Sequence, residues 1–253
     1  MRLFGHQLRG EQRLFWRSRE LAFFTFLLPI LFFVLLGSVY GKDTISADGS
    51  HYKGSHYLLA GMLGYGVAAT AFAGLAIMLV IRRESGVLKR LRATPLPGWA
   101  YVGGVLGSTL FVYALEAIVL VGLGRALFGV PVPAHLFSLA VALLVGALAF
   151  AALGLALTAA VKSAEGSSAV VNAIYLPAAF ISGAFFSPHS FPQFLQTIAD
   201  VLPLTYFIKL VRDIMLHGHQ VWTHPSSIII VLAWGVAGAL IALRTFRWEP
   251  TES

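Results

Sequence analysis

The segment 82–97 places five cations and one carboxylate between two long apolar runs. Val87, Leu88 and Leu91 are spaced to form one apolar edge of a short helix, with the cations around it. Pro95 then ends that helix before the next apolar run begins. The same cations would suit a connecting loop that lies on anionic lipid headgroups. Such a loop needs neither an ordered helix nor a carboxylate, so we expect a docking element for another protein.

Glu116 is a carboxylate within an otherwise uncharged run. At the bilayer centre such a group costs roughly 2.5–3.5 kcal/mol, and it costs less near an interface. We expect Glu116 one or two turns from the outer end of its helix, where it faces protein or water. It is either an outer gate or the ion-pair partner of Arg125, Lys209 or Arg212. The ion pair is favoured, because a position near the interface needs no functional explanation.

The histidines are the other candidates for site chemistry, and six fall in predicted outer loops: His51, His56, His189, His217, His219 and His224. His217-x-His219 with His224 suggests a metal site. No acidic ligand stands at a clear spacing from these histidines, so we expect no bound metal. The absence of Cys excludes disulfides and thiolate sites. The sequence also lacks a nucleophile paired with a base and a Gly-x-x-x-x-Gly-Lys-Ser/Thr loop. We therefore expect no catalytic residue and no phosphate cradle.

The composition indicates that lipid covers much of the protein. Apolar residues make up 58% of the 253 positions and charged residues 11%, whereas a soluble domain carries about 25% charge. A helix needs about 20 predominantly apolar residues to cross the hydrocarbon core. Six runs of this kind predict transmembrane helices: 21–40, 57–81, 99–122, 136–161, 167–186 and 227–243.

The predicted fold class is therefore an all-α membrane protein with six transmembrane helices, forming a single domain over residues 1–253. Residues 1–20 are expected to form an interfacial helix, and 82–98 the loop with its short helix. Residues 187–224 mix charges and prolines with apolar residues. We expect them to form an outer re-entrant or interfacial helical region before the last span.

The distribution of Lys and Arg orients these spans. Thirteen of the 18 fall on the side of both termini and the loop 82–98, and the other side holds Lys42, Lys53, Arg125, Lys209 and Arg212. Because Lys and Arg concentrate in cytoplasmic loops, we expect a multi-pass plasma-membrane protein with cytoplasmic N- and C-termini. The orientation of the spans then explains the net charge of +7, with most basic residues at the cytoplasmic membrane surface. Nucleic acid is therefore not an expected partner.

Two motifs resemble the ABC-2 type transporter permease family. The first is Glu84-x-Gly86-x-Leu88-x-x-Leu91-x-x-Thr94-Pro95, which is similar to the family's cytoplasmic segment between spans two and three. The second resembles the family's C-terminal signature and consists of Ile181-Ser182-Gly183-Ala184-Phe185-Phe186-Ser187-Pro188, Phe191-Pro192, Leu202-Pro203-Leu204-Thr205-Tyr206 and Arg212-Asp213. The length, the number of spans and the orientation also agree with the family.

The resemblance assigns roles to particular residues. It implies that 82–98 carries a coupling helix that contacts a nucleotide-binding subunit, through Arg83, Glu84, Ser85, Gly86, Leu88, Lys89, Arg90 and Leu91. It implies an interfacial N-terminal helix marked by Arg13, Phe15 and Trp16. The residues expected along a substrate path are Phe26, Phe72, Asn172 and Tyr175.

The same resemblance implies the partners. ATP and Mg²⁺ would bind to a separate ABC ATPase, present in two copies, and no cofactor is expected on this chain. Six spans enclose little volume, so we expect the path between two permeases, the second being another copy or a paralogue. In the family, spans two and five lie at that seam.

The implied function is export by alternating access, and the substrate class stays open. The short form without a large outer domain is similar to drug and antibiotic efflux permeases, which implies a hydrophobic or amphipathic substrate. Its size equally fits permeases that export lipid-linked polysaccharide. The alternative from a different class is a membrane scaffold that recruits a soluble partner without transporting anything.

Overall fold

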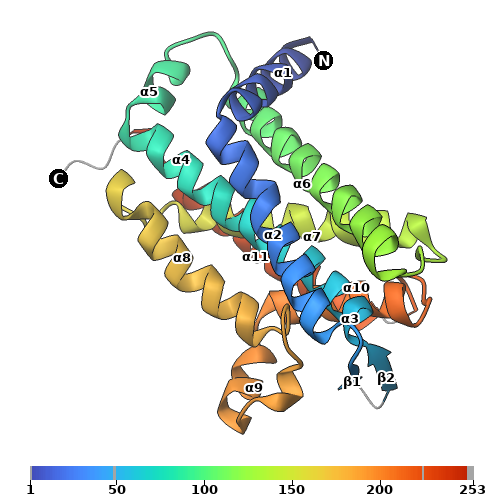
Figure 1. The fold of residues 1–253 in the computed structure, drawn as a ribbon. Coiled ribbons are helices and arrows are strands. Elements are labelled where there is room, and N and C mark those ends of the chain that lie inside the picture. Colours follow the sequence, from blue (N-terminus) through green and yellow to red (C-terminus); the bar gives the residue numbers. More distant parts are fainter. Residues whose placement is uncertain (1, 48–49, 224, 250–253) are drawn as a thin grey trace.

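The structure, a computed structural model, describes residues 2–47, 50–223 and 225–249 and consists of helices with one two-stranded hairpin (Figure 1). In chain order the elements are α1 (Arg2–Arg17), α2 (Arg19–Tyr40), β1 (Thr44–Ala47), β2 (Ser50–Lys53), α3 (Gly54–Gly66), the π-helix η1 (Val67–Gly74), α4 (Leu75–Glu84), α5 (Val87–Arg92), α6 (Gly98–Phe128), α7 (Leu136–Leu157), α8 (Ala164–Ile181), the 3₁₀ turn η2 (Pro188–Ser190), α9 (Gln193–Ala199), α10 (Pro203–Leu216) and α11 (Pro225–Thr245).

Five helical stretches in the described part of the chain are long and apolar enough to cross a membrane. They are α2, the continuous stretch Gly54–Glu84, α6, α7 and α11. The pair α9 and α10 is bent by 81° and forms either a broken sixth span or a re-entrant loop. The predicted all-α membrane fold is confirmed.

α8 covers most of the predicted fifth span 167–186. It has 18 residues and lies beside α4 and η1, but it is not among the five apolar stretches. Polar side chains explain the difference, because Glu165 and Asn172 lower the hydropathy of its first three turns. After α8 the chain turns at Gly183, whose φ is 88°, and enters the region predicted to be re-entrant.

α3 lies at the centre of the bundle and buries nearly all of its residues. It packs against α2, α6 and α10. Two of its glycines allow this close packing. A Cβ on Gly61 would lie 1.9 Å from the carbonyl oxygen of Ala184, and a Cβ on Gly64 would lie 2.3 Å from the side chain of Ile208. The turn after α8 and helix α10 are therefore seated directly on the α3 backbone.

The two ends of the bundle differ in construction. Figure 1 shows α1 and α5 at one end, with the hairpin β1–β2, α9 and α10 at the other. The residues after α11 lie at the end that carries α1 and α5. There Trp248 packs beside Tyr101 in the first turn of α6, with ring centroids 5.9 Å apart. We call this first part, formed by α1, α5 and the adjoining ends of α4 and α6, the basic end.

Candidate functional site

α5 presents its cations outward and its apolar edge inward. Gly86 starts the helix with φ 70°, a left-handed conformation that glycine adopts without steric cost. Leu88 is fully buried and Leu91 is partly buried, and both belong to the hydrophobic core of the bundle. Lys89 and Arg90 are exposed. The apolar edge expected from the sequence therefore fixes α5 to its own chain, and the cations remain available to a partner.

The eight predicted coupling residues divide by exposure. Ser85, Lys89 and Arg90 are exposed, Glu84, Gly86 and Leu91 are intermediate, and Arg83 and Leu88 are buried. The two buried members face the interior of this chain, so neither offers its side chain to a docked protein. The outward surface of the loop is made by Ser85, Lys89 and Arg90, with the partly exposed Glu84 and Gly86. Arg92 is also exposed, and its Nη1 lies 3.8 Å from the Oε1 of Glu249.

Arg83 links α4 to the end of α7. Its Nη1 donates to the carbonyl of Thr158 at 2.8 Å, and its Nη2 donates to the carbonyl of Val161 at 2.5 Å. Its Nε donates to the carboxylate of Glu84 at 2.7 Å. The last carbonyls of a helix lack intrahelical donors and carry the negative end of the helix dipole, so a guanidinium is a favourable cap there. The structure thus gives Arg83 an internal bridging position.

Arg82 links the same end of α4 to α1. Its two Nη atoms donate to the two carboxylate oxygens of Glu11 at 2.9 and 2.7 Å, and Nη1 also donates to the hydroxyl of Tyr101 at 3.0 Å. Glu11 is buried. A bidentate arginine–carboxylate pair is directional as well as strong. It holds three helices, α1, α4 and α6, in one relative position.

Glu11 and Tyr101 were not among the residues singled out in the sequence, and Arg82 was counted only as a charge of the loop. One signal was available. Glu11 is the only acidic residue in α1, where it stands among four Arg residues. A single carboxylate in a basic amphipathic helix is a candidate for a specific cationic partner, but its partner lies 71 positions away.

α1 packs across the start of α6 rather than lying free. A Cβ on Gly104 would meet the side chain of Gln7 at 2.5 Å, and Phe4 covers Gly103 and Gly107. The Nε2 of Gln12 donates to the carbonyl and the hydroxyl oxygen of Ser108, at 3.1 and 2.9 Å. The small residues of α6 thus serve contacts within the chain. They let the amphipathic helix approach closely enough for Glu11 to reach Arg82.

The residues expected to mark α1 lie at its junction with α2. Arg13 is exposed, Phe15 is partly buried and Trp16 is exposed. The ring of Trp16 stacks on Phe26 with centroids 5.9 Å apart and 16° between the planes. Phe26 was expected on a substrate path, and the structure places it in this junction, so it does not join the other residues predicted for that path.

Phe72 and Tyr175 do come together. Both pack against one small cluster formed by η1, α4, α8 and the residues before α8, whose members are Ala73, Ala76, Val80, Val161 and Val171. Asn172 is partly buried on α8, next to this cluster. Three of the four residues predicted for a path therefore lie around the contact of α8 with η1 and α4.

Glu116 lies deeper than expected. α6 extends to Phe128, so Glu116 is about three turns from its end, and its side chain is buried. Its Oε2 accepts a hydrogen bond from Thr70 in the π-helix at 2.9 Å. Its Oε1 has no hydrogen-bond partner among the described residues, and a Cβ on Gly66 would lie 2.3 Å from it. π-helical segments in helices are frequent at functional sites.

The expected ion pair between Glu116 and Arg212 is not formed in the described structure. Arg212 stacks on the ring of Tyr57, 3.5 Å from its centroid, and donates to the carbonyl of Gly183. Tyr57 and Gly66, which lies against Glu116, are nine positions apart in one helical stretch, or about 13 Å along its axis. The sequence shows only that two opposite charges are present. In the structure each lies against a different part of α3, so the two groups are at different depths in the bundle.

An apolar cleft of about 560 Å³ lies between α6 and α7. Its lining includes Ile118, Leu136 and Leu144, each at least 50% exposed, so the cleft opens at the outer surface of the bundle. None of the residues predicted for a substrate path lines it. Its chemistry suits an acyl chain or another apolar group supplied from the surrounding membrane.

The comparisons with known proteins agree with the resemblance seen in the sequence. Residues 2–216 match the family model described as ABC-2 type transporter. The chain is 23% identical over 235 residues to the putative transport permease YvfS of Bacillus subtilis, covering 92% of this chain and 93% of the relative.

Two further relatives match in part. The inner membrane transport permease YadH of Escherichia coli is 25% identical over 184 residues, which is 71% of this chain and 69% of the relative. Nodulation protein J of Rhizobium leguminosarum bv. trifolii is 38% identical over 117 residues, 44% of each chain.

Proposed function

Because the chain belongs to the ABC-2 type transporter family, we propose that it is the permease subunit of an ATP-driven exporter whose ATPase docks on the exposed side of α5. The observation that carries this proposal is the combination of outward cations on α5 with inward ties from Arg82 and Arg83. A partner that binds the cations would move α4 together with α1 and the end of α7. The family implies an ABC ATPase as the partner in general.

ATP and Mg²⁺ bind to the partner, and this chain converts the partner's movement into a movement of α4. A ligand shifts a conformational equilibrium only by its difference in affinity for the two states. The two nucleotide states of the ATPase must therefore contact the surface around Lys89 and Arg90 differently. The resulting movement of α4 opens the path outward by alternating access.

The complete complex has two permeases and two ATPases, in which the second permease is another copy or a paralogue. Support comes from α8, which packs against α4 and η1 but leaves Val170, Ile174 and Phe180 exposed. The basic end faces the cytoplasm of a plasma-membrane protein, because the positive-inside rule places Lys- and Arg-rich loops there. Both termini lie on that side.

Charge reversal on α5 tests the docking. The double variant Lys89→Glu/Arg90→Glu is expected to weaken co-purification with the ATPase at least about tenfold. The reversal turns the proposed attraction between the α5 cations and the ATPase into repulsion between like charges. Lys162→Glu/Arg244→Glu is the matched control, since it changes the same charge at exposed positions. Normal co-purification of the α5 variant, with its fold intact, would remove the docking assignment.

The substrate is proposed to be hydrophobic or amphipathic, such as a drug, an antibiotic or a lipid-like molecule. The apolar cleft and the scarcity of charges in the spans favour this class. Lipid-linked polysaccharide is the second candidate. Substrate-stimulated ATP hydrolysis by the complex in liposomes distinguishes these classes from each other. Hydrolysis that no substrate of either class stimulates, or a genome without a neighbouring ATPase gene, would favour the non-transporting scaffold.

A further inference from the structure

The end of α10 brings three metal-ligating side chains together at the end of the molecule opposite α5. Asp213 lies in the last turn of α10, and His217 caps the helix. Gly218 has φ 68°, which turns the chain back over the helix, and the N–H of His219 donates to the carbonyl of Asp213 at 3.1 Å. The acidic ligand that the spacing of the histidines did not reveal is therefore supplied from one helical turn earlier.

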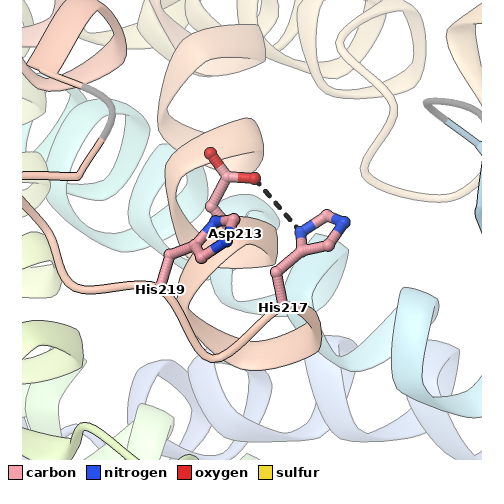
Figure 2. Close-up of side chains that lie close together, drawn as sticks. All are labelled: Asp213, His217 and His219. Carbon is pink, nitrogen blue, oxygen red and sulfur yellow. Dashed lines mark ion pairs between the residues drawn. The ribbon is translucent and has the colours of Figure 1, made fainter.

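The three side chains have the separations of a small coordination site. One ligand atom from each of Asp213, His217 and His219 lies within 4.8 Å of the other two. The Oδ1 of Asp213 is 3.2 Å from the Nδ1 of His217 (Figure 2). Zinc bonds of about 2.0–2.2 Å in a tetrahedron place ligand atoms roughly 3.3–3.6 Å apart. The separation of the Asp213 and His217 ligand atoms is already close to this value.

The Tyr52 hydroxyl supports His217 from the other side of its ring. This tyrosine is in β2, and its hydroxyl is hydrogen-bonded to the Nε2 of His217. A ligating histidine almost always donates its second N–H to an oxygen, which fixes the tautomer and the ring orientation. In the metal-bound form Nε2–H would donate to the Tyr52 hydroxyl, which leaves the lone pair of Nδ1 for an ion held beside the carboxylate of Asp213. The outer support of a metal ligand is thus present.

We propose that Asp213, His217 and His219 bind a divalent transition-metal ion, with Zn²⁺ the best match. Two imidazoles and one carboxylate are donors that zinc takes readily, whereas Mg²⁺ and Ca²⁺ prefer oxygen ligands. Water completes the fourth position, since Asp213 and His217 are partly exposed. Through Tyr52 the bound ion fastens the hairpin β1–β2 to the end of α10.

Zinc binding is measured on the full-length chain purified in detergent with an affinity tag that contains no histidine. After treatment with a chelator, titration calorimetry is expected to show one Zn²⁺ bound per chain at micromolar free metal, together with a rise in the unfolding temperature. His217→Ala and His219→Ala are expected to abolish both signals, and Asp213→Asn to weaken binding. Tyr52→Phe is expected to weaken it roughly tenfold.

His6→Ala is the matched control, because His6 is exposed on α1 at the opposite end. It is expected to bind zinc as the unchanged chain does. The proposal is overturned if the unchanged chain shows no saturable binding, or if the His217 and His219 variants bind like the control. Unfolding temperatures without metal identify a variant that has lost its fold. The measurement involves neither ATPase nor substrate, so its outcome is separate from that of the transport proposal.

Discussion

Replacing Arg83 with alanine is expected to lower the free energy of unfolding by about 3–5 kcal/mol, the cost of removing one partner from a buried ion pair. The substitution removes the hydrogen bonds that Arg83 donates to the carbonyls of Thr158 and Val161, together with its ion pair with Glu84. Thermal unfolding of the detergent-solubilised protein, followed by the loss of the monodisperse species, measures the change.

Arg92→Ala is the control for this experiment. It also removes one arginine from the basic end, but Arg92 is 64% exposed and its contact with Glu249 is 3.8 Å long. Exposed pairs contribute about 0–1 kcal/mol. Arg83→Lys is expected to fall nearer the alanine variant, because an ammonium group lacks the planar fork that reaches three acceptors. Equal unfolding temperatures for Arg83→Ala and Arg92→Ala would show that Arg83 does not bridge α4 and α7.

Breaking the pair between Glu11 and Arg82 is expected to reduce ATP-driven transport at least about tenfold, while the ATPase still co-purifies. The physical reason is mechanical: without the bidentate bond, α1 no longer follows α4 when the docked ATPase moves α5. Glu11→Gln is the mildest change, since it keeps the shape and removes the charge. Transport and co-purification are measured on the same membranes.

Two further variants separate coupling from general damage. Arg9→Ala removes an exposed arginine from the same helix and is expected to transport normally. The exchange Glu11→Arg/Arg82→Glu is expected to recover part of the lost transport, because groups in contact are energetically coupled, by about 0.5–3 kcal/mol. If the exchange is no better than the single variants, and Glu11→Gln transports normally, the pair does not carry the coupling.

Much of the fold follows from the sequence alone. Runs of about 20 apolar residues must become helices in lipid, because backbone groups there find no other partners. The proline stop and the apolar edge of 82–97 likewise predict α5, since both depend on neighbours within two turns. The exception is α8, whose polar residues make its hydropathy ambiguous, although it forms an uninterrupted helix.

The candidate metal site was only partly visible in the sequence. Asp213 and His217 are four positions apart, and residues at that spacing on a helix are neighbours. In the sequence Asp213 also belongs to the Arg212-Asp213 part of the C-terminal motif, which already accounts for its presence there. The return of His219 toward Asp213 depends on the left-handed turn at Gly218, and Tyr52 arrives from a strand far away in the chain.

The sequence by itself determined which elements form: apolar helices, a basic end and a short cationic helix with one buried edge. The tertiary structure decided which groups each charged side chain contacts. Arg82 and Arg83 are adjacent in sequence, yet successive side chains on a helix point about 100° apart, so one meets α1 and the other meets the end of α7. Glu116 and Arg212 are opposite charges that α3 keeps at different depths. Such pairings depend on which helices lie side by side, and no local pattern in the chain contains that information.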